Sequence, residues 1–363
     1  RRRVADLALQ ARGNAGVSEL RTRIAEAIRI NGPMPVSLYM LMCLHDPREG
    51  YYATRPGFNA DFTTAPETSQ VFGELLGLWA AHEWMRLGRP RKFWLIEMGP
   101  GRGDMMADMM RAADSVRGFS QAAEIALIEA SPALQREQVQ RLTPRKVQHF
   151  EELGDVPPGP SLIFGNEFLD CMAVRQLVRD GNGWRERQVG LSGDQLIFGI
   201  GPGADLPANV IPVGDQVEVA PALDTLAETI ARRFRQHPGR ALFIDYGPDD
   251  RSPGDTLRSF RAGRQIDPLD APGLSDLTAD VDFPRLTRIC ESEGLMVHGP
   301  IRQGYFLTRL GARERAQSLA KANTGRSAEI KAAVQKLVAP EDMGARFKAI
   351  CLSPYGTETP PGF

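Results

Sequence analysis

Short apolar stretches alternate with amphipathic ones between residues 92 and 247. An apolar run of roughly four to eight residues, bounded by turn residues, indicates a strand buried on both faces. The stretches with this pattern are KFWLIEM (92–98), AEIALIEA (123–130), KVQHF (146–150), PSLIFGNE (160–167) and RALFIDYG (240–247). Residues 103–112 and 133–141 have helical spacing, and Ser131-Pro132 suits the start of the second helix. The alternation predicts an α/β fold with a parallel sheet covered on both faces.

The first 90 residues are predicted to form a helical region with one long polar loop. Helices are expected over 18–30 and 68–87, and another apolar stretch covers 38–44. The apolar stripe of the longer helix comprises Val71, Leu75, Leu78, Trp79 and His82. Because His82 shares this stripe, we expect it to pack in the core rather than act as a base. The polar segment 45–70 is long for a compact domain, which is typical of functional loops.

A β-rich insertion is predicted between the fourth and fifth strands, over residues 171–239. Turn signals at Asp180-Gly181 and Ser192-Gly193-Asp194 separate strand-like runs, which indicates a β-meander. A helix follows, with an apolar stripe of Leu223, Leu226, Ile230 and Phe234. The insertion is thus expected to add a small sheet to the main domain.

The C-terminal part is expected to contain an antiparallel hairpin over 294–310 and then a helical tail over 312–363. Ile330, Val334 and Leu337 stack at helical spacing within this tail. The chain is therefore divided into a helical N-terminal region (1–90), a main domain (91–311) and the tail. No internal repeat is visible.

Composition restricts the function classes. The chain has 363 residues, of which 42% are hydrophobic and 25% charged, and its formal net charge is −1. This balance argues against a basic body made for nucleic acid. The four cysteines are far apart and show no ligand-like spacing, so neither a disulfide framework nor a metal site is expected.

The sequence predicts no membrane span, because no apolar run approaches the roughly 20 residues that a spanning helix needs. The initial residues, RRRVADLALQARGNAG, are rich in arginine but include Asp6, so their transit-peptide character is weak. A cytoplasmic protein is therefore expected, with the mitochondrial matrix as the alternative.

Three glycines at alternate positions follow the first predicted strand, in the string LIEMGPGRGDMMADMM (95–110). Gly99, Gly101 and Gly103 would lie at the carboxyl end of that strand, where open α/β sheets bind ligands. Glycine lets a ligand lie against the backbone, and the following helix N-terminus offers free N–H groups. The turn predicts a nucleotide-like cofactor, although a generic strand–helix connection has similar residues.

The acidic residues around this turn discriminate between two cofactors. Asp104 stands where a dinucleotide site usually has its last glycine, and its charge would face two phosphates. S-adenosylmethionine (SAM) carries an ammonium and a sulfonium but no phosphate. Glu97 could hold that ammonium, and Glu129, after the second strand, could accept both ribose hydroxyls. The residues therefore favour SAM over a dinucleotide.

Several strings resemble one family, the MidA-type SAM-dependent methyltransferases. The resemblance extends from about residue 33 to 350 and includes DFTTAPETSQVFGE (61–74), GNEFLDCMAVRQ (165–176) and SDLTADVDF (275–283). It implies a class I methyltransferase fold (Rossmann-like) and a protein arginine methyltransferase that acts on a partner such as a respiratory complex I subunit. The chain departs from the family pattern at Ala60, Cys171 and Ala173, which concerns the substrate side.

The acceptor is expected beside the end of the fourth strand, at Asn166, Glu167 and Asp170. Carboxylates could orient a guanidinium by bidentate hydrogen bonds and localise its charge away from the attacking nitrogen. Glu167 is the first candidate for this orienting role and Asp170 the second. The alternative is that Asn166 and Glu167 only cap a helix.

Two further groups of polar residues have open interpretations. Thr64, Glu67 and Gln70 could close over SAM or meet the acceptor, or they could open the helix at 68–87. Asp276, Asp280 and Asp282 could form an acidic cluster that attracts a basic protein segment, or a solvated loop with helix caps.

Three functions compete at this stage. The first is a SAM-dependent protein methyltransferase acting on arginine. The second is an assembly chaperone that keeps the SAM fold and binds a respiratory subunit without essential catalysis. The third, an NAD-dependent oxidoreductase, is disfavoured by Glu97 and Asp104.

Overall fold

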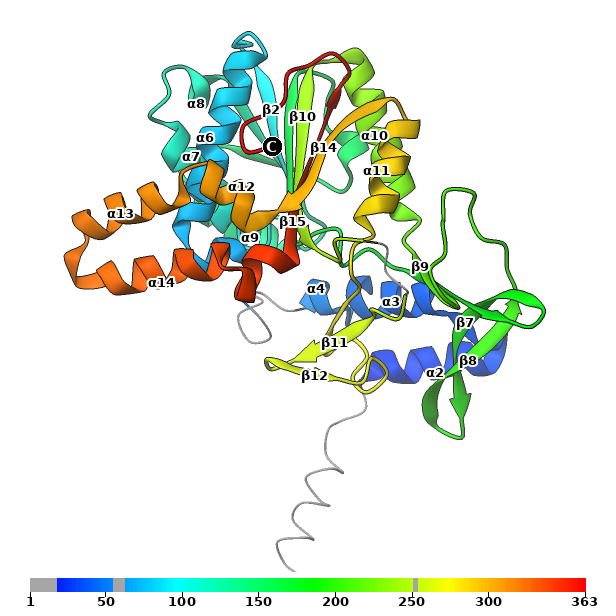
Figure 1. Cartoon of the computed structure of the whole chain (residues 1–363). Helices are drawn as coiled ribbons and strands as arrows, with labels where there is room; N and C mark the ends of the chain where they lie inside the picture. Colours follow the sequence, from blue (N-terminus) through cyan, green and yellow to red (C-terminus); the bar gives the residue numbers. More distant parts are fainter. Residues whose placement is uncertain (1–17, 55–62, 251–253) are drawn as a thin grey trace, which may run out of the picture.

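A central twisted sheet organises the molecule (Figure 1). In the computed structural model, residues 18–54, 63–250 and 254–363 are described. Within these residues, seven strands form the central sheet in the order β14-β15-β10-β5-β2-β3-β4. Their bounds are β2 (Phe93–Met98), β3 (Ala123–Ile128), β4 (Val147–Phe150), β5 (Ser161–Asn166), β10 (Gly239–Tyr246), β14 (Leu295–Arg302) and β15 (Phe347–Pro354).

The strand order creates a crevice next to β2. Five neighbouring strands, β10, β5, β2, β3 and β4, pair in parallel. Strand β15 is antiparallel to both β10 and β14. The chain runs from β2 outward to β3 and β4 and then returns to the other side of β2 as β5. Ligands bind at such a switch point, beyond the carboxyl ends of the strands. The parallel strands lie where the sequence predicted them.

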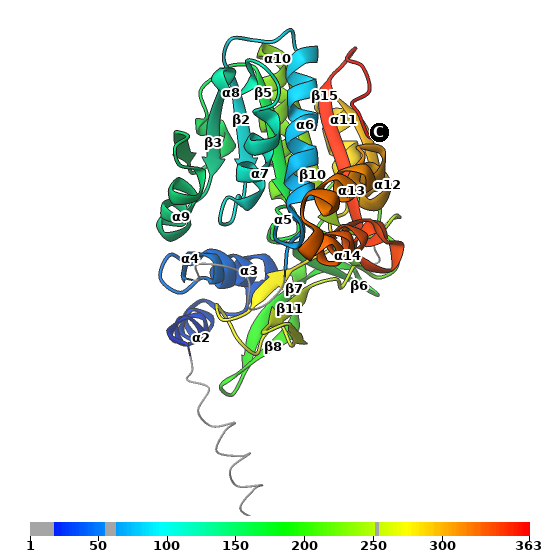
Figure 2. The ribbon, with the colours of Figure 1, turned by 90° about the vertical axis from the view of Figure 1, so that its left-hand side faces the viewer.

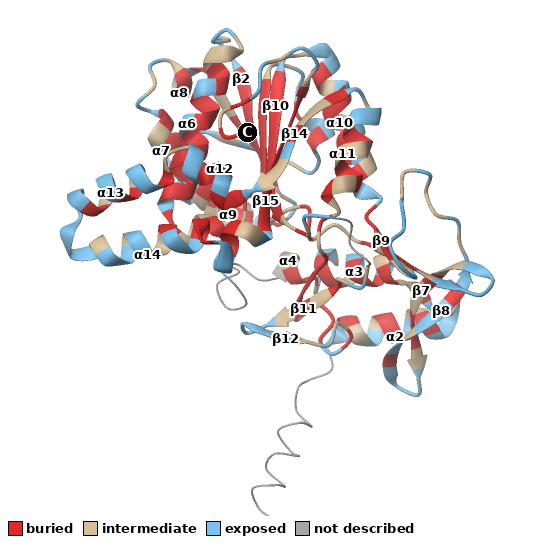
Figure 3. Ribbon diagram, viewed as in Figure 1, coloured by how far each residue is buried: buried red, intermediate tan, exposed pale blue. Residues whose placement is uncertain are grey.

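Each central strand sends alternate side chains into two separate cores. On β2, Trp94 and Ile96 belong to one core, and Phe93 and Leu95 belong to the other. Strands buried on both faces read as continuous apolar runs for this reason. Helices α6 (Gln70–Arg86) and α7 (Asp104–Ala113) cover one face, and α10 (Ala222–Gln236) and α11 (Phe283–Ser292) cover the other (Figures 1 and 3).

A lower lobe lies under the carboxyl ends of the strands (Figure 2). The predicted meander is present as β6, β7 and β8, and β9 and β1 complete its sheet. The elements of the lobe are α2 (Glu19–Asn31), β1 (Met34–Pro35), α3 (Val36–His45), α4 (Tyr51–Thr54), β6 (Arg175–Asp180), β7 (Gly183–Ser192), β8 (Gln195–Gly203), β9 (Gln216–Val219), β11 (Arg258–Arg261), β12 (Arg264–Ile266) and β13 (Asp276–Thr278). Helix α3 contacts β6 and β7 within this lobe.

Short helices complete the connections. They are α5 (Ala65–Thr68), α8 (Phe119–Ala122), α9 (Pro132–Leu142), η1 (Leu153–Asp155), α12 (Gln303–Arg309), α13 (Ala312–Ala322), η2 (Thr324–Arg326), α14 (Ser327–Val338) and η3 (Pro340–Gly344). Helices α13 and α14 pack on each other, and their outer sides are exposed (Figure 3).

The predicted hairpin over 294–310 is wrong. Its first half is β14, but Gln303–Arg309 form helix α12, which buries Phe306 and Leu307. The partner of β14 is β15, which comes from the tail. The tail is therefore not only helical, because its strand Phe347–Pro354 inserts between β14 and β10.

The long N-terminal helix also differs from its prediction. Ser69 is extended and separates α5 from α6, and its side chain caps α6 through the N–H of Val71. His82 is not packed in the core, since its side chain is 48% exposed. Twelve of the 17 residues of α6 are buried, and Leu78 of the predicted stripe is exposed like His82, so the apolar stripe did not identify the exposed side of the helix.

Helices α6 and α7 approach closely enough to exclude a side chain between them. A Cβ added at Gly77 would lie 2.2 Å from the carbonyl oxygen of Met109, and one at Gly73 would lie 2.6 Å from Cβ of Asp108. Helix α7 begins directly after the glycine turn at the end of β2. The close packing therefore fixes the helix whose N-terminus faces the crevice.

We expect Gly77→Ala to lower the free energy of unfolding by about 2 kcal/mol, because the methyl group meets backbone that cannot rotate away. The gain in helix propensity, about 1 kcal/mol, does not offset this clash. Urea denaturation measures the change. Gly325→Ala, where a Cβ meets nothing within 4 Å, is the control. Equal midpoints for the two variants would contradict this packing.

Candidate functional site

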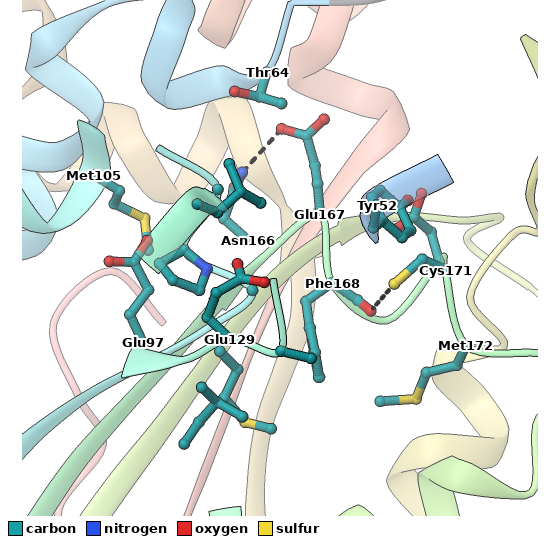
Figure 4. A pocket seen from close by; sticks show the side chains of 18 of the residues that line it. Tyr52, Thr64, Glu97, Met105, Glu129, Asn166, Glu167, Phe168, Cys171 and Met172 are labelled. Atoms are coloured by element: carbon teal, nitrogen blue, oxygen red, sulfur yellow. Dashed lines mark hydrogen bonds between the residues drawn. The ribbon is translucent and has the colours of Figure 1, made fainter. Parts of the chain in front are cut away.

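A cavity of about 1240 Å³ lies between the carboxyl ends of the strands and the lower lobe. Residues that follow β2, β3 and β5 line it, together with the last residue of β10 and several residues of the lower lobe. Figure 4 shows Glu97, Glu129, Asn166 and Glu167 around this space. The topology thus brings most of the predicted site residues to one place.

The glycine turn has the backbone conformation that its sequence suggested. Gly99, Gly101 and Gly103 have φ values of 63°, 52° and 83°, which side chains rarely adopt. Gly99 and Gly101 line the cavity, but Gly103 does not. Gly103 is the N-cap of α7, and a Cβ there would point at Gln138 on α9. The predicted cofactor contact of Gly103 is therefore wrong; its role is to begin the helix.

Glu97 is a buried carboxyl at the end of the cavity that Gly99, Gly101 and Glu129 also line. We call this the donor end, after the methyl donor that it would hold. It is 2% exposed, and its Oε2 has no hydrogen-bond partner among the described residues. Burial, followed by the charge of nearby Asp104, raises the pKa of Glu97 to about 8. A cation bound here would restore the ionised form. The carboxyl therefore fits the ammonium of SAM.

Glu129 is fixed by the start of α9. Its Oε1 accepts the N–H of Ser131 at 2.8 Å, and its Oε2 accepts Nε2 of Gln138 at 3.3 Å. Burial raises the pKa of Glu129. Each carboxylate oxygen can accept a further hydrogen bond, so the side chain suits a pair of ribose hydroxyls. Gln138 also donates to the carbonyl of Gly101 at 2.7 Å, which couples the sugar side to the glycine turn.

Thr64 and Glu67 form the capping box of the short helix α5 and also line the cavity, whereas Ser69 caps α6; a contact of Thr64 or Glu67 with SAM stays a prediction. The N–H of Thr64 donates to Oε2 of Glu67 at 3.2 Å, and Glu67 pairs with Arg102 of the glycine turn at 3.1 Å. Gln70 lies outside the cavity and donates to Glu74 at 3.0 Å. The predicted acceptor contact of Gln70 is therefore wrong. Asp61 and Ala60 lie outside the described residues.

Glu167 holds a strained position at the end of β5. Its φ is 49°, which costs a residue with a side chain about 1–2 kcal/mol. Its Oε1 accepts the N–H of Ala65 at 3.0 Å and Nδ2 of Asn166 at 2.9 Å (Figure 4). Burial raises the pKa of Glu167 to about 7. A turn rather than a helix follows β5, so these residues do not cap a helix of their own segment.

Asp170 accepts two hydroxyls that come from different elements. Tyr246 Oη of β10 and Thr278 Oγ1 of β13 both donate to its Oδ2 at 2.7 Å. Burial raises the pKa of Asp170. Neither Asp170 nor Glu167 forms an ion pair with a lysine or arginine of the described residues. Half-buried Glu167 and buried Asp170 therefore line the cavity without an ion pair to a lysine or arginine in the described part of the chain.

The predicted acidic cluster is not formed. Asp276 is buried, lines the cavity and accepts Tyr52 Oη at 2.9 Å. Asp280 and Asp282 do not line it. Asp282 is the N-cap of α11 and accepts the N–H of Arg285, so the helix-cap interpretation is correct for it. The turn after β13 directs these side chains to different elements.

Sequence reasoning missed two hydroxyl donors of the cavity, Tyr52 and Thr278, and left open whether Tyr246 lines the cavity or only ends its strand. Tyr52, Tyr246 and Thr278 line it and bond to its acids. The position of Tyr246 at the end of a parallel strand was a usable signal. Tyr52 and Thr278 belong to the lower lobe, and no local pattern places them at the sheet. Their contribution depends on tertiary packing.

The donor end of the cavity fits SAM on its own chemistry. It combines bare glycine backbone, a buried carboxyl oxygen without a partner and a carboxylate suited to a diol. Asp104 also lines the cavity, and its charge would oppose a pyrophosphate. Glu97, Glu129, Gly99 and Gly101 are the residues that would hold SAM.

Comparison with known proteins agrees with this chemistry. Residues 75–301 match the sequence model of a family described as S-adenosyl-L-methionine-dependent methyltransferases. The mitochondrial protein arginine methyltransferase NDUFAF7 of Xenopus tropicalis is 34% identical over 92% of this chain and 86% of its own. The human NDUFAF7 protein is also 34% identical, over 90% of this chain and 82% of its own.

Two solved structures have the same fold over nearly the whole chain. A Burkholderia thailandensis protein bound to S-adenosyl-homocysteine has a TM-score of 0.81 and 26% identity, and covers 94% of this chain and 93% of its own. A native structure of a protein of the same superfamily and organism gives a TM-score of 0.82 with 26% identity, covering 95% of this chain and 94% of its own. These matches confirm the predicted class I methyltransferase fold.

One prediction is contradicted by the relatives. They are named mitochondrial, so the expectation of a cytoplasmic protein is wrong. The weak transit character of the first residues was the basis of that expectation, and those residues lie outside the described part. None of the helices in the described residues is both long and apolar enough to cross a bilayer.

The extent of the family match and the identity to full-length relatives agree with the chemistry of the donor end. On these grounds, the chain belongs to the family of S-adenosyl-L-methionine-dependent methyltransferases.

Proposed function

We propose that this enzyme transfers a methyl group from SAM to the guanidinium of an arginine in a partner protein. The observation that carries the proposal is the pair of carboxyl groups, half-buried Glu167 and buried Asp170, that line the cavity beside the donor site. Buried carboxylates are costly unless they are paired, and a guanidinium offers the charge and the planar donors that pair them. The arginine methyltransferase names of the relatives support the same acceptor.

On the donor side, Glu97 binds the ammonium and Glu129 binds the ribose hydroxyls. The backbone of Gly99 and Gly101 lies against the rest of the cofactor. Bound in this way, SAM supplies an electrophilic methyl group on a sulfonium. The acids fix its orientation, because the two ends that they hold lie on opposite sides of that sulfur.

On the acceptor side, Glu167 and Asp170 orient the guanidinium. Hydrogen bonds to two of its nitrogens localise the positive charge there and leave the third nitrogen free to attack. Alignment of that nitrogen with the methyl group supplies much of the rate, since positioning is worth roughly 7–11 kcal/mol in intramolecular reactions. Asp276 also lines the cavity and adds a third carboxyl group there.

The transfer balances as a single displacement. The electron pair of the nitrogen forms the new N–C bond while the C–S bond breaks. The electron pair of the broken C–S bond stays on sulfur. The nitrogen loses one proton. Glu167, whose pKa is raised to about 7, lies in the cavity and accepts it.

The acceptor protein is proposed to be a subunit of respiratory complex I, and the enzyme to act in the mitochondrial matrix. The resemblance and the mitochondrial relatives support this setting. An assembly role without essential catalysis is the competing function. It requires that assembly continue when methyl transfer is abolished.

The affinity for S-adenosylhomocysteine should rise with pH through Glu97. Because the free carboxyl has a pKa of about 8 and the bound ammonium favours the ionised form, binding releases a proton. The association constant should rise up to about tenfold between pH 6 and 7 and less between pH 7 and 8. Isothermal titration calorimetry measures it. Glu97→Gln should bind more weakly and lose this pH dependence, and an unchanged slope in that variant would contradict the role of Glu97.

Glu167→Gln should abolish most methyl transfer and leave donor binding intact. We expect kcat to fall about 100-fold or more, because the variant lacks the charge that orients the guanidinium. It also lacks the carboxylate that accepts the proton. Mass spectrometry of methylated arginine in the acceptor measures the rate. Glu124→Gln, at the amino end of β3, is the matched control and should retain full activity.

Three outcomes decide between the functions. Transfer to arginine by the wild type and its loss in Glu167→Gln support the proposal. Full activity of Glu167→Gln contradicts the acceptor site. A wild type that methylates no arginine, or a Glu167→Gln variant that still supports assembly, favours the assembly role.

A further inference from the structure

Asp245 is a buried carboxylate that the reaction itself does not use. It is the seventh residue of β10, it is 0% exposed and it does not line the cavity. No lysine or arginine of the described residues pairs with it. Burial and the charge of Asp170 raise its pKa. A buried carboxyl without a cation lowers the stability of the folded protein unless it accepts hydrogen bonds.

Those hydrogen bonds go to the loop that carries the acceptor acids. Asp245 Oδ2 accepts the consecutive N–H groups of Phe168, Leu169 and Asp170 at 3.0, 2.7 and 3.2 Å. Its Oδ1 accepts the N–H of Tyr246 at 2.8 Å. One carboxylate oxygen therefore fixes three successive backbone groups after β5.

The bonds begin where the chain leaves the sheet. The N–H of Glu167 still donates to the carbonyl of Ile244 at 2.9 Å, which continues the ladder between β5 and β10. Glu167 then takes its left-handed φ of 49°, and the three residues held by Asp245 follow at once. Without this anchor, a residue with a side chain would relax toward a more favourable φ.

The next residue of β10 completes the arrangement. Tyr246 bonds to the side chain of Asp170, whereas Asp245 bonds to its main chain. Two adjacent residues of one rigid strand thus fix both the path of the loop and the direction of its acid. Sites held by strands are positioned more closely than sites on free loops.

We infer that Asp245 is a positioning residue for methyl transfer: by binding three consecutive amides, it holds Glu167 in its strained conformation and directs Glu167 and Asp170 at the acceptor. This inference rests on the proposed acceptor site. It assigns Asp245 no contact with donor or acceptor.

A double-mutant cycle separates positioning from a general effect on folding. Asp245→Asn keeps the shape of the side chain but replaces one acceptor oxygen by an NH2 group. This NH2 group cannot accept a hydrogen bond from a backbone N–H that faces it. We expect kcat to fall about 100-fold, since a small misplacement can cost that much. The dissociation constant for S-adenosylhomocysteine should stay within about threefold, because Glu97 lies on β2 and Glu129 directly follows β3.

The cycle is completed with Glu167→Gln. If Asp245 acts through Glu167, the double variant should be within about threefold of Glu167→Gln alone. If the kcat of the double variant falls by the product of the two single-variant losses, the inference is overturned. A kcat for Asp245→Asn within about threefold of the wild type would also overturn it.

Glu218→Gln is the matched control for loss of a turn anchor. Glu218 also accepts consecutive N–H groups, those of Thr256 and Leu257, just after Asp255 at a φ of 60°. That turn does not line the cavity. Glu218→Gln should retain a kcat within about twofold of the wild type, and a loss as large as that of Asp245→Asn would show that any anchor has this effect.

Hydrogen exchange tests the anchor without any activity. The amides of residues 168–170 should exchange about tenfold faster in Asp245→Asn with S-adenosylhomocysteine bound. Unchanged exchange would overturn the inference even if methyl transfer is confirmed. If the wild type methylates no arginine, the proposed function fails, and faster exchange would still support the anchor.

Discussion

The structure depends on carboxyl groups that are buried near the carboxyl ends of the parallel strands. Glu97, Asp170 and Asp245 are each less than one-tenth exposed, and none forms an ion pair with a lysine or arginine of the described residues. Carboxylates in such surroundings are destabilised unless hydrogen bonds or a bound cation compensate for the lost water. Asp245 is compensated by backbone amides. Oε2 of Glu97 has no hydrogen-bond partner among the described residues, and the ammonium of a cationic ligand would supply one.

The fold explains why this charge can accumulate there. Parallel strands end together, so Glu97 on β2, Glu129 after β3 and Glu167 after β5 converge although one to three strand connections separate them in the sequence. The lower lobe closes the space below them and supplies Tyr52, Asp276 and Thr278. Donor and acceptor acids therefore share one cavity, at distances that the sheet rather than a flexible loop determines.

The sequence predicted the elements that have a local signal. The parallel strands followed from their apolar runs, and Glu97, Glu129 and Glu167 were found because each stands at the end of such a run. The failures have a common cause. Strand β15 pairs with a partner about 50 residues away, and its sequence reads no differently from the rest of the tail.

Side-chain direction was equally hidden from the sequence. Gly103 and Asp282 begin helices rather than meet a ligand, which spacing alone could not distinguish. His82 shares a stripe with apolar residues, yet α6 is buried on almost every other side. The contribution of Tyr52 depends on the packing of the lower lobe against the sheet, which has no signature in the neighbouring residues.

A crystal structure with S-adenosylhomocysteine and an arginine peptide tests the central claim most directly. The account predicts the amino group of the cofactor within hydrogen-bond distance of Glu97, the ribose hydroxyls on Glu129, and the guanidinium between Glu167 and Asp170. A cofactor whose amino group lies away from Glu97, or a guanidinium bound elsewhere, would contradict it.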